Sequence, residues 1–260
     1  MTRVLSALVL LPVVIGAIWF LPPWGTLLLA LVAAVLAFVE YAAIARALGA
    51  RVLGGTGVAV AAACIVVPTP GVGIVLMTAL LVAGAMSVAF GEPGPHALAD
   101  AAASIFAPIY IGLPLGALAA VRDGGAGDGR VAVLLLLVVI VVSDSAQYYT
   151  GRAFGRRPLS PSISPKKTVE GAIGGVVFGT IAMAVGGHYV FQAPIWAVSL
   201  LGAAISLLGI VGDLFESLLK RSAGVKDSSN LIPGHGGVLD RIDSWLFAAP
   251  VYYVFVRWIA

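Results

Sequence analysis

The sequence predicts an all-α integral membrane protein with about nine transmembrane helices. Hydrophobic residues make up 60% of its 260 positions and charged residues 10%, whereas a typical soluble chain carries about 25% charged residues. Apolar runs recur at lengths close to the ~20 residues that a helix needs to cross the hydrocarbon core of a bilayer. A transmembrane β-barrel would alternate apolar and polar residues, and the unbroken run LLLLVVIVV excludes that pattern.

Short connections separate the expected spans. We place them at about 4–21, 25–45, 52–68, 71–90, 98–120, 131–151, 170–190, 195–219 and 241–259. The span at 52–68 is short and rich in glycine, and GAIGGVVFG inside the seventh span is typical of a helix-packing face. We expect one polytopic domain over 1–260. Its helices in 1–120 would be mainly scaffold, and 131–260 would carry the active site.

Basic residues set the expected orientation. With the N-terminus in the cytoplasm, 12 of the 15 Lys and Arg residues fall on the cytoplasmic side, which agrees with the positive-inside rule. The two most basic loops, 152–168 and 220–241, then share that side. We therefore expect a polar site at the cytoplasmic boundary of a bacterial inner (plasma) membrane.

Carboxylates gather near this boundary on three expected helices. Asp213, Glu216, Ser217 and Lys220 follow helical spacing and share one face of the eighth span. Asp240 and Asp243 share a face at the start of the ninth span, and Asp144 lies inside the sixth. Oxygen ligands of this kind suit Mg²⁺, which also accepts substrate phosphates. The alternatives are structural ion pairs, a helix-cap role for Asp240, and a proton-relay or packing role for Asp144.

Basic side chains and a glycine-rich turn accompany the acids. The residues suited to phosphate binding are Lys166, Lys167, Lys220, Arg221, Lys226 and Arg241. In the glycine-rich turn before Asp240, Gly236 and Gly237 would let the backbone approach a ligand closely, and His235 could form a hydrogen bond with that ligand. The sequence has no second His or Cys at zinc spacing. The alternative interpretation of the basic residues is that they only set the membrane topology.

The run Ser217-x-x-Lys220-Arg221, Lys226-Asp227, Pro233-x-His235-Gly236-Gly237, Asp240-Arg241-x-Asp243 resembles the signature of the phosphatidate cytidylyltransferases, or CDP-diacylglycerol synthases. The stretches SDSAQYYTGRAFGRR and SPKKTVEG, between 143 and 171, also resemble that family. Two positions depart from its pattern. Ser145 stands where Thr is usual, and Val169 stands where Trp is common, which puts an aromatic stacking role there in doubt.

The resemblance implies that CTP and phosphatidic acid are converted to CDP-diacylglycerol and pyrophosphate. Asp213, Asp240 and Asp243 would hold Mg²⁺ with help from Asp144, and Ser217 would serve a monovalent cation such as K⁺. Lys226 would act in catalysis among the other phosphate-binding Lys and Arg residues, and His235 would shape the nucleotide loop. The resemblance also implies a homodimer in membrane lipid, and we expect no nucleic-acid partner.

Two other functions compete with this one. A CTP-dependent membrane lipid kinase would use the same groups but transfer the γ-phosphoryl group. An ion-coupled transporter would explain an acid inside a span. It would not explain why the charges gather in loops on one side.

Overall fold

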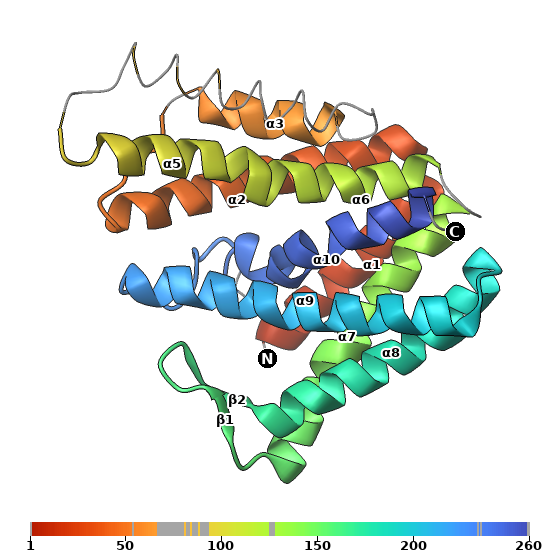
Figure 1. Ribbon diagram of the computed structural model, residues 1–260. Helices are drawn as coiled ribbons and strands as arrows, with labels where there is room; N and C mark the ends of the chain where they lie inside the picture. The colour runs from red at the N-terminus through yellow and green to blue at the C-terminus, as the bar shows by residue number, and fades with distance from the viewer. Residues whose placement is uncertain are drawn as a thin grey trace. The chain divides into compact units, whose positions relative to one another are not determined.

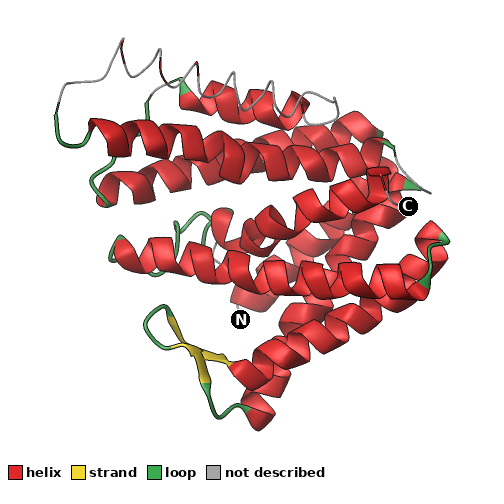
Figure 2. Ribbon diagram, in the orientation of Figure 1, coloured by secondary structure: helices red, strands yellow, loops and turns green. Residues whose placement is uncertain are grey.

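The computed structural model describes residues 2–53, 55–66, 81, 84, 88, 94–124, 128–232, 234 and 236–258. Helices account for most of these residues (Figures 1 and 2). They are α1 (Thr2–Phe20), α2 (Pro23–Ala47), α3 (Thr56–Val66), α5 (Ala97–Ala107), the π-turn η1 (Pro108–Gly112), α6 (Leu113–Asp123), α7 (Gly129–Phe154), α8 (Val169–Phe191), α9 (Ile195–Ser222) and α10 (Leu239–Trp258).

Five stretches of helix are long and apolar enough to cross a membrane: Pro23–Ala47, Ala97–Asp123, Gly129–Phe154, Val169–Phe191 and Ile195–Ser222. Each coincides with a predicted span, and together they indicate a multi-pass membrane protein. The helix α3 covers most of the described part of the predicted span 52–68. The predicted span 71–90 lies almost wholly outside the described residues. The total of nine spans and their orientation therefore stay predictions.

The segment between α7 and α8 corrects one expectation. We expected Lys166 and Lys167 to lie in a loop, but both belong to a strand of an antiparallel hairpin. The hairpin pairs β1 (Pro158–Ser160) with β2 (Ser164–Thr168), and Pro158 lies opposite Thr168. The Thr168 side chain then accepts a hydrogen bond from the Gly171 amide at 3.1 Å, so β2 leads directly into a capped α8.

The chain divides into two compact units. The first comprises Met1–Ala17, Leu21–Ala120 and Leu219–Ile242, and the second comprises Ile18–Phe20, Val121–Leu218 and Asp243–Ala260. In the first unit, Tyr41 of α2 donates a hydrogen bond to the Ala103 carbonyl at 3.0 Å. Its ring packs near Phe106 and Tyr110, which anchors α2 against α5 and η1.

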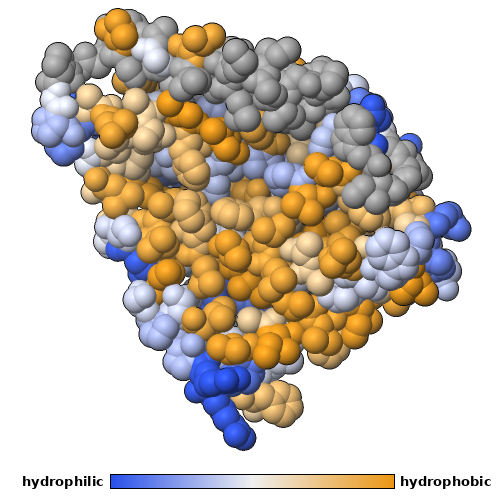
Figure 3. All heavy atoms as spheres, in the orientation of Figure 1, coloured by the Kyte–Doolittle hydropathy of each residue, from blue (hydrophilic) through white to orange (hydrophobic). Residues whose placement is uncertain are grey.

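In the second unit, small residues bring α7 and α8 into close contact. A Cβ on Gly171 would lie 2.7 Å from the Gln147 carbonyl oxygen of α7, and a Cβ on Gly175 would lie 3.0 Å from that of Ser143. The predicted packing face of GAIGGVVFG is thus confirmed. The other side of α8 exposes large apolar side chains, including Ile173 and Ile181. Hydrophobic side chains cover most of the visible surface over α8 and α9 (Figure 3), as expected of a lipid-facing surface.

Candidate active site

The helices α9 and α10 carry the predicted acidic residues as the sequence indicated. One face of α9 presents Asp213, Ser217 and Lys220, because the helix is continuous from Ile195 to Ser222. Since α10 begins at Leu239, Asp240 and Asp243 lie within its first two turns. Lys220 and Asp240 belong to the first unit, whereas Asp213 and Asp243 belong to the second.

In the first unit, Asp240 is held by several donors at once. Its Oδ1 forms an ion pair with the Lys220 ammonium. Its Oδ2 accepts hydrogen bonds from the Ser228 amide at 2.9 Å, the Ser228 hydroxyl at 2.8 Å and the Gly237 amide at 2.7 Å. Burial raises the pKa of Asp240, but the Lys220 bond and the two amides outweigh it and lower that pKa to about 2. Asp240 is therefore an ionised anchor.

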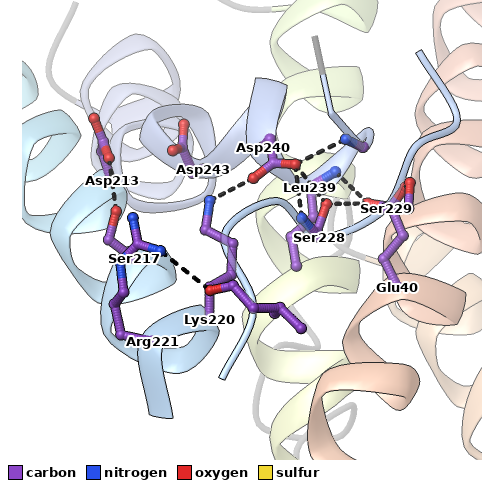
Figure 4. Close-up of polar contacts among 12 residues, drawn as sticks. Glu40, Asp213, Ser217, Lys220, Arg221, Ser228, Ser229, Leu239, Asp240 and Asp243 are labelled. Carbon is purple, nitrogen blue, oxygen red and sulfur yellow. Dashed lines mark hydrogen bonds and ion pairs between the residues drawn. The ribbon is translucent and has the colours of Figure 1, made fainter. Parts of the chain in front are cut away.

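Glu40 is a buried acid that sequence reasoning missed. It lies on α2, is 5% exposed, and accepts four hydrogen bonds from the segment around 228–239. Its Oε1 accepts from the Ser229 hydroxyl at 2.7 Å and the Val238 amide at 3.0 Å. Its Oε2 accepts from the Ser228 hydroxyl and the Leu239 amide, both at 2.8 Å (Figure 4). The available signal was a single acid within an otherwise apolar span, which is costly unless it is paired.

Gly236 and Gly237 of the predicted nucleotide turn lie against these carboxylates. Gly236 has a φ of 80°, a conformation that favours glycine. A Cβ on Gly237 would overlap the Ser228 hydroxyl and both carboxylate oxygens of Glu40. The amides of residues 237–239 donate to Asp240 and Glu40, so this part of the turn binds carboxylates of its own chain. His235 lies outside the described residues.

In the second unit, Asp213 forms an ion pair with Lys167 of β2, and the two side chains are 34% and 17% exposed. The Ser217 hydroxyl donates to Asp213 at 3.4 Å. A Cβ on Gly212 would lie 2.5 Å from the Asp243 carbonyl oxygen. The backbones of α9 and α10 therefore nearly touch here, and this contact brings Asp213 and Asp243 to facing turns. Glu216, one turn along α9, is fully buried.

The remaining predicted residues are exposed: Asp144 on α7, Lys166 on β2, and Arg221, Lys226 and Arg241. The guanidinium of Arg221 donates to the Val225 carbonyl at 3.3 Å, which closes the end of α9. The role of Asp144 as a metal ligand stays a prediction. The four basic side chains are accessible to a solvent-borne anion. Their phosphate-binding roles stay predictions.

The predicted carboxylates are compatible with Mg²⁺ if water and substrate supply most of its ligands. Among the described residues, no three Asp, Glu, His or Cys side chains are placed to hold a metal ion together. Mg²⁺ needs only one or two carboxylates when water and substrate phosphates supply the other ligands. Asp213 and Asp243 offer two such carboxylates on packed helices. The contacts of Asp240 favour anchoring over metal binding.

The long apolar helices define a multi-pass membrane protein. Each of its two units holds an acid paired with a lysine, a combination that suits a phosphate-bearing substrate. The cytidylyltransferase family matches residues 1–259. This chain belongs to that family.

Several relatives are named phosphatidate cytidylyltransferase. The chain is 48% identical to the one from Synechocystis sp. over 130 residues, which is 49% of this chain and 44% of the relative. It is 46% identical to the one from Aquifex aeolicus over 113 residues, 44% of this chain and 42% of that protein. It is 48% identical to the one from Bacillus subtilis over 113 residues, 43% of this chain and 42% of that protein. The chain thus matches less than half the length of each of these relatives.

Proposed function

We propose that this protein is a phosphatidate cytidylyltransferase, which converts CTP and phosphatidic acid to CDP-diacylglycerol and pyrophosphate. The observation that carries the proposal is the match of the cytidylyltransferase family to residues 1–259. The relatives named phosphatidate cytidylyltransferase support the lipid phosphate as the acceptor.

The reaction is a displacement at the α-phosphorus of CTP. An oxygen of the lipid phosphate forms a bond to that phosphorus. The bond between the α-phosphorus and the oxygen that bridges it to the β-phosphorus breaks, and pyrophosphate leaves with that oxygen. Both substrates are anions, so the site must neutralise charge and hold attacker and leaving group in line. No nucleophile from the protein is required, because the lipid phosphate is already ionised.

Two ion pairs would supply this neutralisation and alignment. Each joins a lysine predicted to bind phosphate to an acid: Lys167 to Asp213, and Lys220 to Asp240. When bound, Mg²⁺ would neutralise phosphate oxygens and stabilise the departing pyrophosphate. Asp213 and Asp243 would hold it. Lys167 could then leave Asp213 for a phosphate oxygen, because its ammonium is a mobile point charge on a flexible stem.

Exposed basic residues would complete the binding of the two substrates. Lys166, Lys226 and Arg241 are accessible and carry the positive charge that the phosphates need. Arg221 has a planar fork that suits an oxyanion.

The cellular setting belongs to the same proposal. Nine spans with the N-terminus inside would place the basic loops, and with them the site, at the cytoplasmic face of a bacterial plasma membrane. Phosphatidic acid would enter laterally from the bilayer and CTP from water. A homodimer and a K⁺ ion near Ser217 are further parts of the proposal.

The test uses purified protein in detergent–lipid micelles with phosphatidic acid, Mg²⁺ and CTP labelled in its α-phosphate. We expect metal-dependent label in CDP-diacylglycerol, with release of pyrophosphate. Parallel samples contain γ-labelled CTP with phosphatidic acid or with lipid alcohols. Label in the lipid phase of those samples would instead show a kinase. A folded protein that binds CTP but transfers neither label would overturn the proposal.

A further inference from the structure

We infer that Glu40 is a positioning residue for cytidylyl transfer. From α2, it holds the segment 228–238 and the start of α10, and through them the Lys220–Asp240 pair. The inference rests on the proposed function, because the pair matters to catalysis only if that function holds. The contacts that support it all lie within the first unit of the chain.

Both carboxylate oxygens of Glu40 take part in hydrogen bonds. Each oxygen has two donors within hydrogen-bond distance, one serine hydroxyl and one backbone amide at the start of α10. Leu239 is the first residue of α10 and Val238 immediately precedes it, and backbone N–H groups at a helix start have no partner within the helix. A carboxylate is favoured at that end by the helix dipole. A residue about 200 positions earlier in the chain therefore caps α10.

Ser228 connects Glu40 to Asp240. Its hydroxyl oxygen lies 2.8 Å from a carboxylate oxygen of each acid, and its amide donates to Asp240 at 2.9 Å. A hydroxyl carries one hydrogen and donates to one acid at a time, whereas the amide stays on Asp240. A shift of Glu40 would therefore move the serine that Asp240 also binds. Asp240 in turn fixes the Lys220 ammonium.

All four donors to Glu40 come from Ser228, Ser229, Val238 and Leu239. If the acid served only to stabilise the helices of the scaffold, partners on α3 or α5 would be expected. Its partners lie instead on both sides of the glycine turn that precedes Asp240. Glu40 therefore positions the segment that carries Asp240.

Glu40→Gln tests the inference with little change in shape. The amide oxygen of Gln can still accept two hydrogen bonds, but its NH₂ group accepts none. Two of the four donors then lose residue 40 as an acceptor. We expect kcat for cytidylyl transfer to fall about 10- to 100-fold, by analogy with the loss of a hydrogen-bond partner that orients a metal ligand. Because Glu40 acts through other residues, KM for phosphatidic acid should change less than kcat.

Two variants make this test specific. Glu40→Asp keeps the charge and both acceptor oxygens on a side chain one methylene shorter, so it should retain more activity than Glu40→Gln. Thr26→Val changes another buried polar residue of α2 and should leave kcat unchanged. Equal activity of Glu40→Gln and the unmodified protein, or equal losses in the Gln and Asp variants, would overturn the inference.

A second measurement does not depend on activity. Hydrogen exchange of the unmodified protein should show slow exchange for the amides of 237–239, and Glu40→Gln should speed it there without affecting the middle of α9. Suppose the unmodified protein makes no CDP-diacylglycerol but Glu40→Gln exchanges faster at 237–239. The proposed function then fails, while the role of Glu40 in holding the segment 228–238 stands. If exchange at 237–239 is the same in both proteins, the inference itself is wrong. Should Glu40→Gln fail to fold, Ser229→Ala removes one of the four bonds and is read by the same two measurements.

Discussion

Asp240 and Asp213 each form an ion pair with a lysine, but they differ in how firmly the rest of the structure holds them. Asp240 also accepts two backbone amides and a serine hydroxyl, and its side chain is 5% exposed. Asp213 has one long hydrogen bond from Ser217 besides its lysine, and its side chain is 34% exposed. Asp240 is therefore suited to hold the segment before α10 in place. Asp213 is suited to exchange its lysine for a metal ion.

This contrast predicts the largest effect for Asp213→Asn. A bound divalent cation contributes several kcal/mol of charge stabilisation in the transition state. We therefore expect cytidylyl transfer to fall by about 100-fold or more, since each 1.36 kcal/mol is a factor of ten. Thermal unfolding should change little, because Asp213 is partly exposed. Full activity with normal Mg²⁺ dependence would remove Asp213 from the metal site, and the same comparison applies to Asp243→Asn.

For Asp240→Asn we expect loss of stability together with loss of activity. Breaking a buried ion pair costs about 3–5 kcal/mol because the remaining charge is left without a partner, and residual exposure of Lys220 reduces that figure. The pKa of Asp240 is lowered from 3.8 to about 2. Its contribution to stability is therefore present above about pH 4 and is lost as the pH falls toward 2. Acid unfolding of the two proteins should differ at pH 6 and converge near pH 2. A constant difference over that range would contradict the anchor role.

Gly237→Ala tests the close approach of the turn to its two acids. The added Cβ would overlap Glu40 and Ser228, and overpacking typically costs about 1–3 kcal/mol. We expect a lower unfolding temperature and reduced kcat, with faster hydrogen exchange at 237–239. Gly224→Ala shows the effect of backbone strain without contact, because Gly224 has a φ of 73° and no neighbour within 4 Å of the added Cβ, whereas Gly237 does not have a positive φ. An unchanged unfolding temperature and kcat in Gly237→Ala would contradict the close approach of the turn to the two acids.

The smallest effect is expected at the exposed Arg157–Glu170 pair beside the hairpin. Arg157 is 72% exposed, and exposed ion pairs contribute little to stability. Arg157→Ala should leave both activity and thermal unfolding unchanged in the assays used for the other variants. A marked loss of activity would extend the site to the residue that precedes β1 and would show that this region contributes more than Lys167.

Much of the helical architecture could be predicted from the sequence, because apolar length and helical spacing are local properties. The facing of Asp213, Ser217 and Lys220 on α9 followed from spacing alone. The hairpin at 158–168 could not be predicted, because its strands are short and polar. Glu40 was missed for a different reason. Its partners lie about 190 residues away, and no local pattern records such a contact.

The most direct test of the contrast between Asp213 and Asp240 is a Mg²⁺ titration of cytidylyl transfer by the unmodified protein, Asp213→Asn and Asp240→Asn. We predict that Asp213→Asn raises the Mg²⁺ concentration for half-maximal rate or abolishes transfer at every concentration. We predict that Asp240→Asn lowers the maximal rate with an unchanged half-maximal concentration. An increased Mg²⁺ requirement in Asp240→Asn, with none in Asp213→Asn, would contradict the account.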